Sequence, residues 1–298
     1  MDNNNGKVFY DLNKRALEFR NSKEYFVGDR IVRYLKLLKG FHFLKFFKQQ
    51  GEDFCRVVFK KKKNPPVQDL DFSHPYTGEK IAVYTAIYGN YDAIPEPLYK
   101  DPKCDYYIFT DQEISPDSVW KKIEADFPEA VDTAFLKNRY VKMLPHRVLN
   151  NYRYSMYLDG NLILTSAVSL YMNTFESSCG IGMHLHPSNK SIYEEVKYNL
   201  RLKKINKNEA KIIKEQYKKD NMPKNYGMTE CNVILRDHEN KECVRIMESW
   251  WEHICSGIKR DQLYFTYVLF KCGHKVNELY VLGNNINSNP MFIREKHI

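Results

Sequence analysis

The chain has 298 residues, of which 43% are hydrophobic, and it carries a formal net charge of +9. This length and apolar content suffice for one substantial α/β core and exclude a compositionally disordered chain. The positive charge suits nucleic acid, an anionic membrane face or a phosphate-bearing small substrate, and composition does not choose among these partners.

Cysteine usage and hydropathy predict a cytoplasmic protein. The seven cysteines form an odd set without a CxxC pair or zinc-type spacing, so we expect reduced thiols. No apolar run approaches the roughly 20 residues of a membrane helix, and the first residues lack the pattern of a signal peptide. Any membrane association is therefore expected to be peripheral.

The N-terminal quarter of the chain is basic. Residues 25–49 interleave aromatic and aliphatic residues with lysines and arginines, which predicts a basic amphipathic helix or helical hairpin. Its apolar face could lie among lipid headgroups or pack on a catalytic core. Four consecutive lysines and two prolines within 59–66 are typical of a charged linker. We therefore divide the chain into an extension over 1–77 and a catalytic domain over 78–298.

Strands and helices alternate after this linker. Compact apolar runs at 81–88 and 104–111 predict strands, residues 136–150 predict a helix, and a third strand ends at Leu158. Such alternation favours a largely parallel sheet, in which ligands gather at the carboxyl ends of the strands. Because Asp111 and Asp159 fall at such ends, we expect one ligand-binding site to use both.

The run that ends at Leu158 breaks into Asp159, Gly160 and Asn161 before it becomes apolar again. Two oxygen-bearing side chains two residues apart suit a hard divalent cation that phosphates already hold. The glycine lets the backbone approach a ligand closely. An Asp-Gly pair between two apolar runs also predicts a hairpin turn, so both interpretations stand at this point.

The lysine-rich segment 194–224 predicts an exposed helix and a loop. Its charges fit either a solvated face or a basic flap over a phosphate-bearing substrate. A strand over 231–236, a helix over 242–256 and a helix that begins near Arg260 follow it. In the helix over 242–256, Trp250 and Trp251 are expected at the core and at its rim.

The order of these segments resembles a family of glycosyltransferase-like proteins long catalogued as a domain of unknown function, with plant mucilage-related and bacterial polysaccharide-locus members. The segments that carry the resemblance are 83–92, 109–111, 142–146, 158–161, 184–187, 229–236, 250–252 and 260–262. The same order is more distantly similar to glycogenin-like transferases. The resemblance implies a GT-A-like, Rossmann-like α/β fold with a mixed, mostly parallel sheet flanked by helices and an N-terminal helical extension.

The resemblance also implies a donor site for a nucleotide sugar. The first strand and its loop hold the nucleotide in that pattern, which points to Thr85, Tyr88 and Asn90. The helix before the acidic turn supplies positive charge to the diphosphate, which points to Lys142 and Arg139. A charge on a flexible stem suits a phosphate that must later leave.

A divalent metal, Mn²⁺ or Mg²⁺, is implied at Asp159 and Asn161, where it would bridge the diphosphate. Asn161 departs from the commoner Asp-x-Asp form and offers a neutral carbonyl, so a third ligand is left open. His184 and His186 are two residues apart, but imidazole is a poor ligand for magnesium. We therefore assign both histidines to the acceptor side.

Acceptor and catalytic residues are expected within 229–232 and 260–262. Glu230 is the candidate general base of an inverting transfer, because one group must take the proton of the acceptor hydroxyl. Asp261 is a second candidate for this base. In a retaining enzyme, Asp261 and Gln262 would instead lie beneath the sugar, and Arg260 would contact the acceptor. Asp261 also fits a simple helix start.

The sequence thus predicts a cytoplasmic glycosyltransferase that moves a sugar from a nucleoside-diphosphate sugar to a hydroxyl of a glycan or lipid-linked glycan, in surface polysaccharide synthesis. A peripheral contact with the inner membrane face and no nucleic acid partner are expected. The alternative is a non-catalytic basic module that binds nucleic acid or an anionic membrane surface. An enzyme that hydrolyses rather than transfers is a third possibility.

Overall fold

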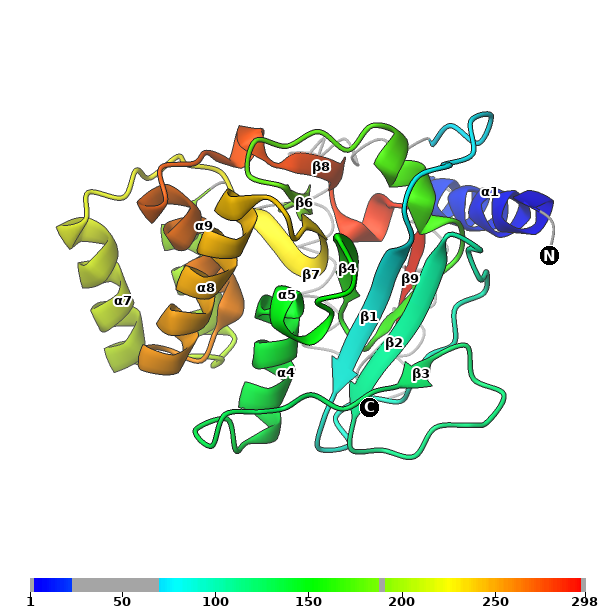
Figure 1. The fold of residues 1–298 in the computed structure, drawn as a ribbon. Helices are drawn as coiled ribbons and strands as arrows, with labels where there is room; N and C mark the ends of the chain where they lie inside the picture. The colour runs from blue at the N-terminus through cyan, green and yellow to red at the C-terminus, as the bar shows by residue number, and fades with distance from the viewer. Residues whose placement is uncertain (1–2, 23–69, 188–190, 296–298) are drawn as a thin grey trace, which may run out of the picture.

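The structure, a computed structural model, describes residues 3–22, 70–187 and 191–295 (Figure 1). The amphipathic segment predicted over 25–49 and the linker at 59–66 lie outside these residues. The predicted boundary between residues 77 and 78 stays a prediction, although the first strand of the described domain begins close to it, at Ile81.

A seven-stranded sheet in the described part of the chain forms the centre of the fold (Figure 1). Its strands are β1 (Ile81–Ile87), β2 (Cys104–Thr110), β3 (Lys121–Lys122), β4 (Tyr154–Leu158), β6 (Ile181–Leu185), β7 (Thr229–Asp237) and β8 (Tyr280–Gly283), in the order β3-β2-β1-β4-β7-β6-β8. β7 is antiparallel to both of its neighbours, and the other four neighbouring pairs are parallel. The predicted mixed, mostly parallel sheet is confirmed.

The central strands are buried on both faces. All seven residues of β1 are buried, as expected for a strand that reads as a continuous apolar run. One core cluster includes Tyr84, Val141 and Trp250, and a second includes Val83, Met156 and Phe292. Alternation along β1 therefore sends successive side chains into two different cores.

Helices pack against this sheet. They are α4 (Ala134–Met143), α5 (Pro145–Val148), α6 (Ile192–Arg201), α7 (Lys207–Lys219), α8 (Lys241–Ser256) and α9 (Asp261–Lys271). Figure 1 shows α7, α8 and α9 gathered at the end of the molecule away from β2 and β3. On α8, Trp250 is fully buried and Trp251 is half-buried, which confirms their predicted places at the core and its rim.

One predicted helix is wrong in its extent. We expected a single helix over 136–150, but α4 ends at Met143 and a separate short helix begins at Pro145. Proline has no backbone N–H and its ring clashes with the preceding turn, so the helix stops before it. The break places Lys142 in the last turn of α4.

A second layer lies beside the large sheet. The strands β5 (Leu162–Leu164) and β9 (Phe292–Arg294) pair antiparallel, and three short 3₁₀ helices lie nearby in sequence: η1 (Val168–Asn173), η2 (Val276–Glu278) and η3 (Ile286–Ser288). An additional helix that the sequence patterns did not indicate, α1 (Asn3–Arg20), buries Tyr10 and Leu17. Its Asn13 Nδ2 donates to the carbonyls of Pro290 and Phe292, so α1 is attached to β9.

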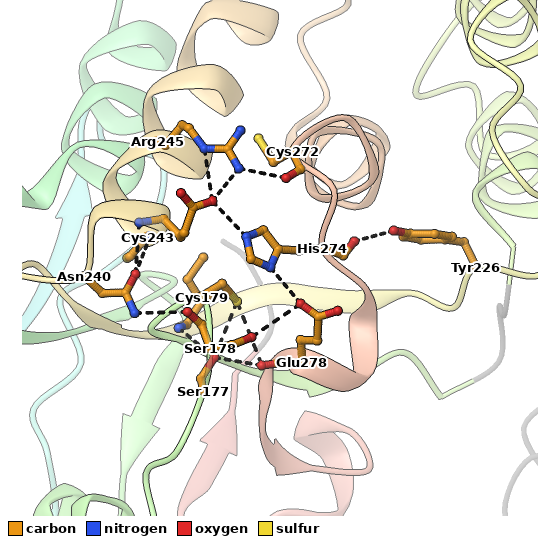
Figure 2. A network of polar contacts seen from close by, with 12 residues as sticks. Ser177, Ser178, Cys179, Tyr226, Asn240, Cys243, Arg245, Cys272, His274 and Glu278 are labelled. Atoms are coloured by element: carbon orange, nitrogen blue, oxygen red, sulfur yellow. Dashed lines mark hydrogen bonds and ion pairs between the residues drawn. The ribbon is translucent and has the colours of Figure 1, made fainter.

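A polar network fastens the edge of the sheet to α8 (Figure 2). The imidazole of His274, in the turn after α9, lies 2.7 Å from Glu278 Oε2 and 2.9 Å from Glu242 Oε2. It thereby joins η2, which leads into β8, to the first turn of α8. Among the described residues, no helix is both long enough and apolar enough to cross a membrane.

Candidate active site

The turn over 159–161 lies between two sheets. The strand before it, β4, pairs with β1 and β7, whereas β5 after it pairs with β9. The hairpin interpretation is therefore wrong, because the flanking strands do not pair with each other. A Cβ added to Gly160 would lie 2.7 Å from Cγ1 of Ile87, so the absence of a side chain lets this turn pass the end of β1.

Lys142 links two carboxylates from distant parts of the chain. Its Nζ lies 3.1 Å from Asp159 Oδ1, at the carboxyl end of β4, and 2.8 Å from Asp261 Oδ2, in the first turn of α9. The Lys142 side chain is only 2% exposed, whereas that of Asp159 is 35% exposed. A buried ammonium thus contacts a carboxylate that solvent partly reaches.

Arg139, one turn earlier on α4, adds a second positive charge. Its Nε lies 3.5 Å from Asp261 Oδ2, beyond a good hydrogen bond, and has no hydrogen-bond partner in the described structure. Burial alone would lower the pKa of Lys142, but the carboxylates of Asp159 and Asp261 outweigh it and raise this pKa. Burial would raise the pKa of Asp261, yet Arg139 and Lys142 hold it well below its usual range. Lys142 and Asp261 therefore both stay ionised at neutral pH.

A fully buried arginine sets the position of Lys142. Arg236 on β7 donates 2.7 Å hydrogen bonds to the Lys142 carbonyl and to the Tyr84 hydroxyl. The carbonyls at the end of a helix carry partial negative charge, so a guanidinium there is favourable. Sequence reasoning missed this role of Arg236, because only the packing of α4 on the sheet brings the two elements together.

Residues near the end of β1 lie beside the strand that leads into the acidic turn. Thr85 pairs in register with Leu158, next to Asp159, and its buried Oγ1 has no hydrogen-bond partner in the described structure. The two carboxylate oxygens of Asp111 accept the Gly89 N–H at 2.9 and 3.1 Å. In this structure Asp111 therefore holds the loop after β1. Asn90 in that loop has a left-handed backbone with φ of 52°.

Tyr88 lies at the start of the same loop. Its ring meets Phe127 edge to face, with the ring centroids 5.9 Å apart. Asn138 on α4, which the sequence did not single out, donates from Nδ2 to the Ala86 carbonyl at 2.5 Å. This hydrogen bond fixes the helix of Lys142 and Arg139 against the end of β1.

The fit of a divalent metal rests on Asp159 and Asn161. The Asn161 Nδ2 donates to the Glu295 carbonyl at 2.9 Å, so a metal could use only the carbonyl end of this amide. Within the described ranges, no three His, Cys, Asp or Glu side chains form a metal cluster. The donor set fits Mg²⁺ or Mn²⁺ bound chiefly by substrate phosphates and water with one carboxylate, and it does not fit a cage made of protein ligands alone.

Glu230 lies on β7, opposite His184 of β6. Its side chain is buried, and Oε2 accepts a hydrogen bond of 2.7 Å from the Ile286 N–H. Burial raises the pKa of Glu230 to about 7, against the hydrogen bond and the charge of Arg294, which lower it. A carboxylate that titrates near neutral pH is suited to general base catalysis.

Gln262 and Asn232, two other residues of the predicted acceptor segments, lie beside and on β7. Gln262 Nε2 donates to the Thr229 carbonyl at 3.2 Å, which places Gln262 beside the start of β7. Asn232 accepts the Asp159 N–H at 2.8 Å through its backbone carbonyl, and its buried side-chain Oδ1 has no partner in the described structure. Asn232 thus lies between the predicted catalytic strand and the acidic turn.

The two histidines lie in different surroundings. His184 is fully buried, with Nε2 2.8 Å from Asn289 Nδ2 and its ring against Phe292. Burial lowers the pKa of His184 to about 3. An acceptor could reach this neutral imidazole only if Asn289 and Phe292 moved. The His186 side chain is 15% exposed, and its Nε2 lies 3.8 Å from Glu195 Oε2.

Arg260 lies immediately before Asp261, at the start of α9. Its Nε donates to the Lys204 carbonyl at 3.4 Å, so it connects the charged site to the segment between α6 and α7. The structure therefore brings together Lys142, Arg139, Asp159 and Asp261. Glu230 lies on the neighbouring strand β7, and Gln262 lies beside the start of that strand. His184 is enclosed in the core.

Comparison with known proteins gives one family, and solved structures that match the chain do so at low sequence identity. The family model described as "TOD1/MUCI70, glycosyltransferase-like domain" matches residues 119–297. No curated protein matches the chain.

Two solved structures show the level of structural similarity. The apo structure of the bifunctional glycosyltransferase WbbM has a TM-score of 0.41 and 9% identity, over 70% of this chain and 40% of that one. The apo form of mouse xyloside xylosyltransferase 1 has a TM-score of 0.38 and 11% identity, over 68% of this chain and 84% of that one. The family match is the stronger finding: because it spans more than half of the chain, the protein belongs to the TOD1/MUCI70 glycosyltransferase-like domain family.

Proposed function

We propose that the protein transfers a sugar from a nucleoside-diphosphate sugar to a hydroxyl of a glycan or lipid-linked glycan. The observation that carries this proposal is the contact of one buried ammonium, Lys142, with Asp159 at the carboxyl end of β4 and with Asp261 at the start of α9. Membership of a glycosyltransferase-like family supports glycosyl transfer as the reaction.

The charge of the site supports a diphosphate ligand together with a cation. Lys142 and Arg139 are balanced by Asp159 and Asp261, so the cluster has a formal charge of zero before a donor enters. A diphosphate would add negative charge that these four residues do not offset. A divalent metal at Asp159 and Asn161 would neutralise this charge and stabilise the leaving nucleoside diphosphate.

The protein's own residues would act in distinct ways. Thr85 and Asn138 lie near the end of β1, and the buried, unpartnered Thr85 hydroxyl would have to become exposed to contact the nucleotide. Lys142 and Arg139 would orient the diphosphate as the glycosidic bond breaks. Glu230 would take the proton of the acceptor hydroxyl, because its raised pKa favours accepting a proton near neutral pH.

Asp261 is assigned a positioning role in this proposal. A carboxylate held ionised by two cations is a weak proton acceptor, so it would orient Lys142 rather than act as the base. We further propose a role in surface polysaccharide synthesis, in the cytoplasm and with a peripheral contact at the membrane. This role rests on the resemblance noted for the sequence.

The test is release of nucleoside diphosphate from a panel of nucleotide sugars with Mn²⁺, with and without glycan acceptors. We expect one donor to turn over, and we expect Lys142→Gln and Asp159→Asn each to lower kcat/KM by about 10²-fold or more. Lys137→Gln, a lysine on the same helix, is the matched control and should retain activity. Unchanged turnover in both site variants, or no binding of any donor, would contradict the proposal.

A further inference from the structure

A row of lysines runs along α7 on one side of a shallow groove. Lys207, Lys211, Lys214 and Lys218 are spaced by four, three and four residues, which places them one above another on a single helix face. We call these four residues the lysine stripe. Together with Glu215, Leu200 and Ala210 they line a groove of about 280 Å³ beside α6.

The lysine stripe is poorly neutralised by the protein. Lys211 lies 4.0 Å from Glu215, at the limit of an ion pair. Among the described residues, no carboxylate lies within 4.0 Å of the other three ammonium groups of the stripe. Four positive charges along about 16 Å of helix create a positive potential that would attract a negatively charged ligand.

The lysine stripe leads toward the candidate active site. The first helical residue of α7, Lys207, follows Lys204 by three residues, and the Lys204 carbonyl accepts the hydrogen bond from Arg260. Asp261, the next residue, contacts Lys142 at 2.8 Å. A ligand along α7 would therefore have one end beside Arg260, close to the residues proposed to bind the donor.

We propose that the lysine stripe binds the acceptor, and that this acceptor is an acidic glycan with carboxylates or phosphodiesters at intervals along its chain. The inference rests on the proposed function, because it names the substrate class for that same site. Spaced lysines suit such a polymer, since each ammonium is an independent charge on a flexible stem and does not require one fixed geometry.

Two other anionic partners fit the groove less well. A helix on a lipid surface buries its apolar face in the bilayer, but the apolar face of α7, formed by Ala210, Ile213 and Tyr217, packs into the core. Single-stranded nucleic acid is usually bound with aromatic rings that stack on bases. The described lining of the groove contains no aromatic residue.

The experiment measures binding of labelled probes to the full chain without a donor. The probes are an oligogalacturonate, a glycerol phosphate oligomer and a neutral malto-oligosaccharide of equal length. We expect at least one acidic probe to bind, and the variant K207Q/K211Q/K214Q/K218Q to weaken its Kd at least about tenfold at 0.1 M salt. The neutral probe should not bind measurably.

A variant with the same loss of charge provides the control. K100Q/K121Q/K241Q/K275Q removes four exposed lysines outside the groove and should keep the affinity for the acidic probe. Equal affinities of the wild type and the stripe variant, or no binding of either acidic probe, would overturn the inference. It would also fail if a single-stranded oligonucleotide or anionic vesicles bound more tightly than the acidic glycans through the stripe.

Nucleoside diphosphate binding, measured on the same preparations, separates this inference from the proposed function. The stripe variant should bind the nucleotide as the wild type does, whereas Lys142→Gln should lose nucleotide binding and keep acidic-glycan binding. If neither the wild type nor any variant bound the nucleoside diphosphate, the result would count against the proposed function and not against the role of the lysine stripe.

Discussion

Single carboxylates in this protein differ widely in acidity because their surroundings differ. Asp261 stays ionised beside Lys142 and Arg139, whereas burial raises the pKa of Glu230 to about 7. Environments that push the pKa values of neighbouring acids apart usually give them different roles. The same burial gives Glu230 an effect on stability as well as on the proposed reaction.

The Glu230→Gln variant tests the proposed base. We expect kcat/KM to fall by about 10²- to 10⁴-fold, because glutamine cannot accept the proton. In the wild type, kcat/KM should rise with pH through about 7 as Glu230 ionises, and the residual activity of the variant should lack this rise. A variant with the wild-type rate and pH profile would show that Glu230 serves only structure.

The stability of the Glu230→Gln variant relative to the wild type should also depend on pH. Because folding raises the pKa of Glu230 from 4.5 to about 7, its stabilising contribution is complete below pH 4.5 and is lost as pH rises through 7. Between pH 4.5 and 8, the free energy of unfolding of Glu230→Gln should therefore gain about 1 to 3 kcal/mol relative to wild type. Urea unfolding measures this change, and the exposed Glu252→Gln should not show it.

Gly160 allows a second residue-level prediction. A Cβ at this position would lie 2.7 Å from Cγ1 of Ile87, so Gly160→Ala should cost about 1 to 3 kcal/mol of stability through overpacking. The double variant Gly160→Ala/Ile87→Ala should be more stable than the sum of the single changes allows, because the second change removes the clash. Additive effects in this cycle would show that the close approach does not matter.

At the scale of elements, local sequence predicted which segments are regular better than where each one ends. The apolar run of β1 is nearly continuous, so its assignment needed no tertiary information. Pro145 divided a periodic segment into two helices, although the apolar positions continue through it. The helix α1 was not foreseen, because it is held by Tyr10, Leu17 and the Asn13 hydrogen bonds to residues far away in sequence.

The His274 network predicts a pH-dependent attachment between elements (Figure 2). Burial lowers the pKa of His274, but hydrogen bonds and charges of Glu242 and Glu278 outweigh it and raise this pKa. The network therefore stabilises the fold fully below the ordinary histidine pKa of 6.5, and this contribution is lost as pH rises through the raised value.

His274→Gln should accordingly lower the free energy of unfolding by about 1 kcal/mol at pH 6 and by much less at pH 9. Chemical denaturation at the two pH values measures the difference. His253→Gln on α8, whose ring hydrogen-bonds within its own helix, is the control and should show no such dependence. Equal losses at both pH values would mean that the imidazole acts through packing and not through its charge.

At the scale of the whole molecule, the candidate site exists only where several elements meet. Lys142 belongs to α4, Asp159 directly follows β4, and Asp261 begins α9. Arg236 on β7 fixes the end of α4 by its hydrogen bond to the Lys142 carbonyl. A ligand that bridges these elements should stabilise the fold as a whole, because it binds the folded state and not the unfolded chain.

Nucleoside diphosphate with Mn²⁺ should therefore raise the Tm, with a stabilisation of about 2.7 kcal/mol at a hundred times its Kd. Chelation by EDTA should reduce this increase, because Asp159 and Asn161 offer too few ligands to hold a metal without phosphates and the nucleotide would lose its counter-charge. A nucleoside is the control ligand. If EDTA left the increase in Tm unchanged, Lys142 and Arg139 would suffice for the diphosphate.

The sequence by itself determined the α/β class, the largely parallel sheet and the placing of Asp159 at a strand end, because these follow from local periodicity and turn chemistry. The tertiary structure alone decided that Lys142 reaches Asp261, that Arg236 fixes the end of α4, and that His184 is enclosed. These contacts join residues separated by 94 to 119 positions. No local pattern encodes such distances, since they depend on how helices pack on a sheet of fixed strand order.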